Sequence, residues 1–101
     1  MKNFSDIVKN EREKRGWILR KAAAELDIDQ AIISKIEKNQ RKATREQVEK
    51  FSKVYNLDLN DLLKLWLSDK IIYEISEQEN PIEILKIAEK QIKYNKEHSD
   101  E

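Results

Sequence analysis

The stretch DIDQAIISKIEKNQRKATR, which runs from Asp27 to Arg45, decides the fold. It opens with two acids around an isoleucine, continues through an isoleucine-rich segment and ends in a basic run. Ile33 and Ile36 stand three positions apart, which indicates the buried face of a helix. We therefore predict a helix over about residues 30–38 that is N-capped by Asp29 and has one face free of core residues.

The segment before this helix predicts a second short helix over about residues 19–26. Its three consecutive alanines, at positions 22–24, favour helix formation and the close crossing of another helix. Asp27 tolerates the left-handed conformation that a tight break requires. A short helix, a three-residue break and another short helix are typical of a helix-turn-helix. Many small helical proteins contain such corners, so a purely structural corner stays open at this point.

The remaining sequence predicts an all-α fold. The 101 residues include one glycine and one proline, which leaves little material for hairpin turns. The expected helices cover about residues 5–15, 19–26, 30–38, 45–55, 61–76 and 81–94, with a frayed tail at 97–101. The predicted caps are Ser5, Asn60 and Asn80 at N-termini, Thr44 with Gln47 as a capping box, and Gly16 and Asn56 at C-termini.

The composition argues against several classes of protein. The absence of cysteine excludes disulfides and thiolate metal sites. No apolar run approaches a membrane span, and the first ten residues lack a signal-peptide core, so we expect a cytoplasmic protein. The single histidine, His98, lies in the expected tail, and the acids follow helix-surface spacing, as Glu11 does with Arg15. We predict no enzymatic activity, no metal and no cofactor.

The net charge of zero conceals an asymmetry along the chain. Residues 1–45 contain 12 lysines and arginines against 7 acids, whereas residues 46–101 contain 8 against 13. The first part therefore carries a net charge of +5 and the second −5. This pattern favours a polyanion-binding module followed by a segment with another purpose. The alternative is a chance distribution over solvated helices.

The free face of the helix at 30–38 has the chemistry of a DNA-reading surface. Projected as a helix, it presents Gln30, Ala31, Ser34, Lys35 and Lys38 opposite the core direction, with Ile32 on the flank. Glutamine bonds an adenine edge, alanine contacts a thymine methyl group, serine bonds either kind of base edge, and lysine favours guanine or a phosphate. No acid lies on this face. An ordinary solvated surface is the competing interpretation.

Residues 7–66 resemble the phage-repressor and Cro type (XRE type) of the helix-turn-helix family. The resemblance is carried, in ungapped register, by REKRGW (12–17), AAAELDI (22–28), IISKIEKNQRKAT (32–44) and VYNLDLNDLL (54–63). Leu26, Ile28, Ile33 and Ile36 match the core positions of the family, and Asp29 matches its N-cap.

The resemblance implies a lambda-repressor-like, five-helix DNA-binding domain at residues 1–67, followed by a C-terminal helical extension at 68–96. It also implies a regulator that binds a palindromic operator as a homodimer, with the helix at 30–38 in the major groove. Gln30, Ala31, Ser34 and Lys35 become candidates for base contacts. The phosphate candidates are Arg20, Lys21, Lys38, Asn39, Gln40, Arg41, Lys42, Thr44 and Arg45. Glu37 matches a family acid that pairs with an arginine of the first helix, here Arg12.

Three positions depart from the family pattern. Ile18 stands where a serine or threonine usually caps the second helix. Leu19 replaces a glutamine that commonly bridges a phosphate and the third helix, and Asp27 replaces the usual glycine of the turn. The first two departures remove a polar anchor, so the approach to DNA is shifted or Trp17, Ile18 and Leu19 pack against another part of the protein.

The second half of the chain presents more apolar surface than one helix of a small monomer buries easily. We predict a homodimer interface there, formed by Leu65, Trp66, Ile71, Ile72 and Ile75. The alternative is that the last helix folds back on the one before it within one chain. The same chain shape also resembles restriction–modification controller proteins and antitoxins of toxin–antitoxin pairs, so a protein partner on the acidic C-terminal helices is a second class of function.

Overall fold

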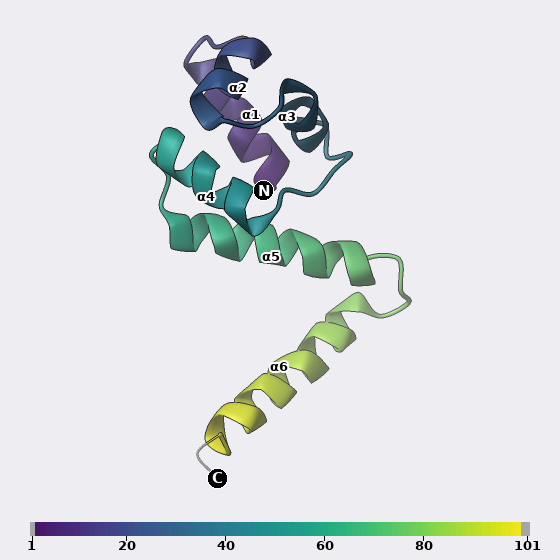
Figure 1. Cartoon of the computed structure of the whole chain (residues 1–101). Helices are drawn as coiled ribbons and strands as arrows, with labels where there is room; N and C mark the ends of the chain where they lie inside the picture. Colours follow the sequence, from purple (N-terminus) through teal and green to yellow (C-terminus); the bar gives the residue numbers. More distant parts are fainter. Residues whose placement is uncertain (1, 100–101) are drawn as a thin grey trace. The chain divides into compact units, whose positions relative to one another are not determined.

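The computed structural model describes residues 2–99, and every regular element in that range is a helix. In chain order the elements are α1 (Phe4–Lys14), α2 (Leu19–Leu26), α3 (Gln30–Glu37), α4 (Arg45–Val54), α5 (Leu59–Ile75) and α6 (Pro81–Glu97) (Figure 1). The chain divides into two compact units, the first ending at Asp69 and the second beginning at Lys70. The division falls inside α5. Within residues 2–99, no helix is both long enough and apolar enough to span a membrane.

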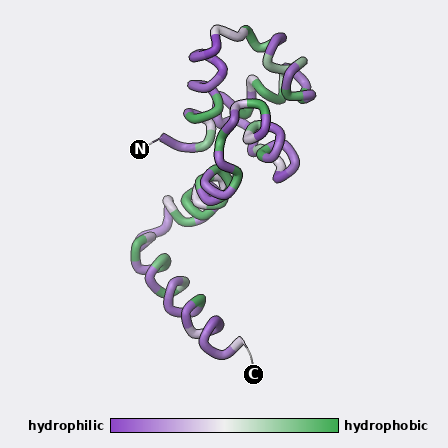
Figure 2. Tube along the Cα trace, turned by 90° about the vertical axis from the view of Figure 1, so that its left-hand side faces the viewer, coloured by the Kyte–Doolittle hydropathy of each residue, from purple (hydrophilic) through white to green (hydrophobic). Residues whose placement is uncertain are grey.

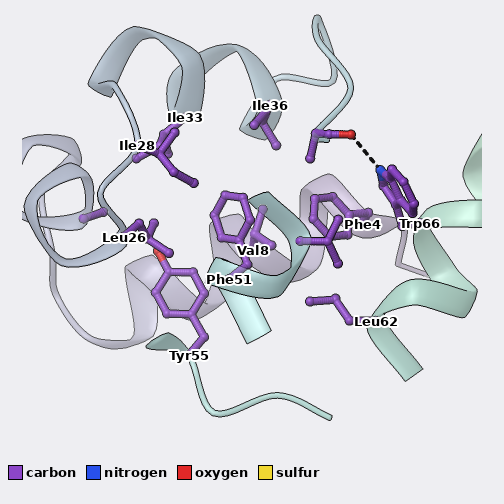
Figure 3. Close-up of a cluster of buried hydrophobic side chains, with 13 residues drawn as sticks. Phe4, Val8, Leu26, Ile28, Ile33, Ile36, Phe51, Tyr55, Leu62 and Trp66 are labelled. Atoms are coloured by element: carbon purple, nitrogen blue, oxygen red, sulfur yellow. Dashed lines mark hydrogen bonds between the residues drawn. The ribbon is translucent and has the colours of Figure 1, made fainter. Parts of the chain in front are cut away.

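The first unit is built around one hydrophobic core to which all of its helices contribute. Phe4 of α1 packs edge-on against Phe51 of α4, with ring centroids 5.8 Å apart, and Phe51 lies 5.9 Å from Tyr55 (Figure 3). Aromatic pairs in this geometry stabilise a core beyond the area they bury. The buried residues are Phe4, Val8, Ala22, Leu26, Ile28, Ile33, Ile36, Ala43, Val48, Phe51, Tyr55, Leu62 and Trp66.

Two of the predicted helix starts are wrong. Asn3, and not Ser5, caps α1: its side chain accepts a hydrogen bond from the Asp6 amide, and the Asp6 carboxylate accepts one from the Asn3 amide. Ser5 is instead buried inside the helix. At the start of α5, the Asp58 carboxylate accepts a bond from the Asp61 amide at 2.9 Å, so the cap lies two positions before Asn60.

The predicted caps of α3 and α4 are confirmed. The Asp29 carboxylate accepts hydrogen bonds from the amides of Ala31 and Ile32. The Thr44 hydroxyl accepts from the Gln47 amide while the Gln47 side chain accepts from the Thr44 amide, which makes a complete capping box. At α6, Asn80 occupies the N-cap position, but its side chain makes no capping hydrogen bond.

Left-handed residues follow the first four helices. Gly16, Asp27, Asn39 and Asn56 have φ angles of 68°, 53°, 58° and 54°. Glycine, asparagine and aspartate are the residues that adopt this conformation at least cost, and it allows the chain to turn away directly after a helix. Asn39 was not anticipated as such a residue.

The second unit consists of the end of α5, a short connection and α6. None of the residues of α6 is buried. Apolar and polar residues are interspersed along α6, and the apolar residues recur at helical spacing (Figure 2). Within this unit a groove of about 480 Å³ is lined mainly by apolar side chains, those of Ile71, Ile75, Ile84, Leu85, Ala88 and Ile92. Of the predicted tail, Glu97 closes α6 and His98 is its C-cap, while residues 100 and 101 lie outside the described range.

Candidate nucleic-acid interface

The two faces of α3 have opposite character, as the helical projection predicted. Ile33 and Ile36 are fully buried, and Ile32 is half-buried against the core. Gln30, Ala31 and Lys35 are exposed and Ser34 is half-buried, so the face opposite the core carries no acid and no bulky apolar side chain. A helix with small and polar residues on its outer side can approach another surface closely.

The corner between α2 and α3 is fixed by a residue that the sequence did not single out. Lys50 of α4 donates a hydrogen bond from Nζ to the backbone carbonyl of Asp27 at 2.8 Å. Its ammonium also lies 3.8 Å from the Asp27 carboxylate, which is almost fully exposed. A lysine at a helix C-terminus satisfies a carbonyl that the helix leaves unpaired. Lys50 thus ties the turn of the helix pair to α4.

The C-terminal end of α3 is fastened to α1 by an ion pair. The Arg12 guanidinium donates two hydrogen bonds of 2.8 Å to the Glu37 carboxylate and a third of 2.8 Å to the Trp17 carbonyl. The side chains of Arg12 and Glu37 are 15% and 5% exposed. The hydrogen bonds to Glu37 raise the pKa of Arg12 above its usual value, and partial burial opposes this shift. The pair predicted by the resemblance is therefore present and oriented in the bidentate manner.

The loop between α3 and α4 starts with a hydrogen-bonded turn. The amide of Asn39 donates to the Ile36 carbonyl and that of Gln40 to the Lys35 carbonyl, at 3.0 and 2.8 Å. From α1, the buried Ser5 hydroxyl donates to the Ile36 carbonyl at 2.7 Å and lies 3.3 Å from Oδ1 of Asn39. Asn39 thus helps to terminate α3 in this structure.

The predicted phosphate contacts lie on one exposed stretch and on one neighbouring helix. All candidates are exposed: Lys38, Asn39, Gln40, Arg41, Lys42, Thr44 and Arg45 on the stretch, and Arg20 and Lys21 on α2. Several of them, including Asn39 and Lys42, also have partners within the chain. Lys21 pairs with Glu25 at 3.0 Å and Arg45 with Glu49 at 3.6 Å, while the Thr44 hydroxyl accepts the capping bond described above. These surface pairs are weak and leave the cations accessible.

The structure explains one of the two lost polar anchors at the start of α2. Leu19 is half-buried and packs against the core, as does Trp17. Trp17 lies 6.1 Å from the Tyr55 ring, with the guanidinium of Arg15 5.9 Å from its centroid. Ile18 stays 59% exposed at the N-cap of α2, where it makes no capping hydrogen bond. The polar anchor is therefore replaced at position 19 by core packing and at position 18 by an exposed apolar side chain.

Two of the five residues predicted for a dimer interface belong to the core region of the first unit. Trp66 is 8% exposed, and its indole donates a hydrogen bond to the Ala43 carbonyl at 2.9 Å (Figure 3). Leu65 is half-buried against the same core. Ile71 and Ile72 are 49% and 54% exposed. The burial of Trp66 leaves little of its surface for a partner, whereas Leu65 and Ile75 are half-buried and stay candidates together with Ile71 and Ile72.

Comparison with known proteins assigns the class. A family model described as helix-turn-helix matches residues 8–62, which is more than half of the chain. The chain belongs to this family, whose XRE-type members are DNA-binding transcription regulators, and the six helices make an all-α, lambda-repressor-like domain with an additional C-terminal helix.

One solved structure gives a more particular likeness. It is described as the SinR protein/SinI protein complex and superposes with a TM-score of 0.55 at 19% sequence identity, over 97% of this chain and 99% of that chain. At this sequence identity the structural similarity supports the fold alone. A search of curated proteins returned no match.

Proposed function

We propose that the protein is a sequence-specific regulator that binds double-stranded DNA with α3 in the major groove. The observation that carries the proposal is the acid-free outer face of α3, which lies next in the chain to a stretch of exposed cations. Residues 38–45 include four lysines or arginines and no acid. A helix that reads base edges and a neighbouring loop that contacts phosphates are the two parts of such an interface.

The base contacts fall to the exposed part of α3. Gln30, at the first position of the helix, bonds adenine through its side-chain amide, and Ala31 contacts a thymine methyl group. Ser34 and Lys35 lie one turn further along and bond base edges deeper in the groove. The buried Ile33 and Ile36 hold this face in place without contributing to it.

The phosphate contacts fall to the loop and the start of α4, with Arg20 and Lys21 as more distant cations. Lys38 and Arg41 supply charge without a partner acid in the loop's own sequence. Thr44 uses its oxygen as an acceptor within the chain, which leaves its hydroxyl hydrogen available to donate to a phosphate. These contacts fix the position of α3 on the duplex and carry no sequence information themselves.

A selection of bound duplexes from a random pool tests the base-reading part of the proposal. We expect an enriched motif whose preferred bases change at one position when Gln30 is replaced by alanine. A pool that shows no enrichment would contradict sequence-specific recognition. The salt dependence of binding tests the phosphate part, because a phosphate-anchored complex loses affinity steeply as salt rises from about 50 to 200 mM.

We further propose that the second unit holds two copies of the chain together, so that the operator is palindromic. With no buried residue in α6, this unit lacks a core of its own, and segments of fewer than about 40 residues seldom fold without additional support. Residues 70–83 carry four glutamates and one lysine, whereas residues 84–97 carry four lysines and two glutamates. Two such segments in antiparallel arrangement place the acidic end of one against the basic end of the other.

The dimer is tested by the mass in solution. Ile71→Glu puts a charge on the exposed apolar surface of the second unit and should convert a dimer into a monomer. Ile18→Glu is the matched control, since Ile18 is the same residue type and is 59% exposed but lies in the first unit. A wild-type protein that stays monomeric at high concentration would contradict the proposal and favour a fold-back of α6. In a dimer, the half-sites would be separated by about one helical turn of DNA, roughly 34 Å.

A second candidate function is a protein-interaction module of the antitoxin type, in which the C-terminal helices bind a different protein. The exposed apolar groove of the second unit and the likeness to a structure of two proteins in complex support it. Such a module shows no duplex affinity that salt could weaken, which separates it from a DNA-binding regulator. A restriction–modification controller would bind operator DNA in the way proposed above. Both alternatives, like the regulator, act in the cytoplasm.

A further inference from the structure

The loop that we propose to contact phosphates is fastened at both of its ends by buried hydrogen bonds from other helices. In the last turn of α3, directly before the loop, the Ile36 carbonyl accepts a hydrogen bond of 2.7 Å from the Ser5 hydroxyl of α1. At the end of the loop, the Trp66 indole of α5 donates to the Ala43 carbonyl at 2.9 Å. The residues in between, from Lys38 to Lys42, are exposed.

The bond from Trp66 differs from ordinary core packing because its acceptor is loop backbone. Ala43 is buried and directly precedes Thr44, the N-cap of α4. Its carbonyl would otherwise lie in an apolar environment with no donor, which is costly for a buried polar group. Fixing this carbonyl fixes the peptide plane at the point where the loop passes into α4.

From these two bonds we infer that Trp66 is a positioning residue for DNA binding, which sets the conformation of residues 39–44 without contacting the duplex. The inference rests on the proposed function, since it states how the phosphate-contacting loop is held. Ser5 does the same at the other end. A loop held in its bound conformation spares the ordering entropy that a mobile loop loses on binding.

The variant Trp66→Phe keeps an aromatic ring in the core and removes the donor to Ala43. The probe is a labelled mixed-sequence duplex, because phosphate contacts do not depend on sequence. We expect about tenfold weaker binding and a slope of log affinity against log salt that is flatter by about one unit, the loss of one phosphate contact. Hydrogen exchange should accelerate at the amides of residues 39–44 and stay unchanged in α2.

Val54→Ala is the matched control for a purely structural effect. Val54 is half-buried against the same core at the far end of α4, nine residues from its start and therefore about 14 Å along the helix. This variant should lose stability and keep both the salt slope and the exchange rates of the loop. Trp66→Leu, which also removes the donor to Ala43 and keeps an apolar side chain, replaces Trp66→Phe if the latter does not fold.

The outcomes separate the inference from the proposed function. Wild-type affinity, slope and loop exchange in Trp66→Phe would overturn the inference and leave DNA binding intact. Equal effects of Trp66→Phe and Val54→Ala on the slope would also overturn it. A wild-type protein without duplex affinity would refute the proposed function, and the exchange measurement alone would then decide whether Trp66 fixes the loop.

Discussion

The ion pair between Arg12 and Glu37 provides a prediction whose magnitude follows from the structure. Glu37→Gln keeps the size of the side chain, removes its charge and turns one of its two acceptors into a donor that faces the guanidinium. Both hydrogen bonds from Arg12 to the carboxylate are affected, while the bond to the Trp17 carbonyl stays. The charge of Arg12 then has no carboxylate bonded to it, in a site where its side chain is 15% exposed.

The expected cost lies between those of surface and buried pairs. Exposed pairs contribute about 0.2–1 kcal/mol, and breaking a buried pair costs about 3–5 kcal/mol. Because Glu37 is nearly buried and Arg12 less so, we expect the free energy of unfolding to fall by about 2–3 kcal/mol. For a unit of this size each kcal/mol lowers Tm by about 4–8 °C, so the loss is roughly 8–24 °C.

Thermal unfolding followed by circular dichroism at neutral pH measures this loss. Glu25→Gln is the control, since it breaks the Lys21–Glu25 pair, whose side chains are about half exposed, and should lower Tm by only a few degrees, roughly 0.5 kcal/mol. Well below Tm, Glu37→Gln should retain the preferred bases of the wild type. Equal shifts in Tm for the two variants would refute the argument that burial gives the Arg12–Glu37 pair its strength.

The remaining predictions concern acid stability, a buried hydroxyl and the DNA contacts. The pKa of Glu11 lies below its ordinary value of 4.5, chiefly because the Arg15 side chain donates a hydrogen bond to it. This contribution is present above about pH 4.5 and lost as pH falls through the lower, folded-state value, so Glu11→Gln should reduce the drop in Tm between pH 7 and pH 3. Among the described residues the buried Tyr55 hydroxyl has no hydrogen-bond partner, and burial raises its pKa to about 12. Tyr55→Phe should therefore increase the free energy of unfolding in urea by about 1 kcal/mol, and a decrease would contradict this reading. Gln30→Ala should cost about 1–3 kcal/mol at one base position, whereas Arg41→Ala should weaken all sequences equally and flatten the salt slope by about one unit, as measured by fluorescence anisotropy; wild-type behaviour of both would refute the docking.

The helices and the inner face of α3 could be predicted from the sequence because they depend on local spacing. Ile33 and Ile36 recur at helical intervals, and Asp29 is the one polar residue directly before that helix. The start of α1 could not be fixed in this way, because Asn3 and Ser5 are both good caps. What decides between them is tertiary: Phe4 packs on Phe51, and Ser5 turns inward to bond the Ile36 carbonyl.

The hydrogen bonds of Trp66 and Lys50 could not be predicted from the sequence for a related reason. The apolar residues of α5 are distributed around most of the helix circumference, so their spacing does not show which of them packs against the core. Trp66 is separated from its acceptor Ala43 by 23 residues, and Lys50 from Asp27 by the same number. Local periodicity carries no information on such pairs, because they depend on how α4 and α5 cross the helix pair.

The division of α3 into a buried and an exposed face has a consequence for how such a protein changes over generations. Substitutions at exposed surface positions commonly alter stability by no more than about 0.5 kcal/mol. Gln30, Ala31 and Lys35 are exposed and make no contribution to the core, so their exchange costs the fold little. A lineage can therefore acquire a new target sequence through a few point mutations at these positions while its scaffold persists, and duplicated copies can diverge to separate targets without a loss of foldability.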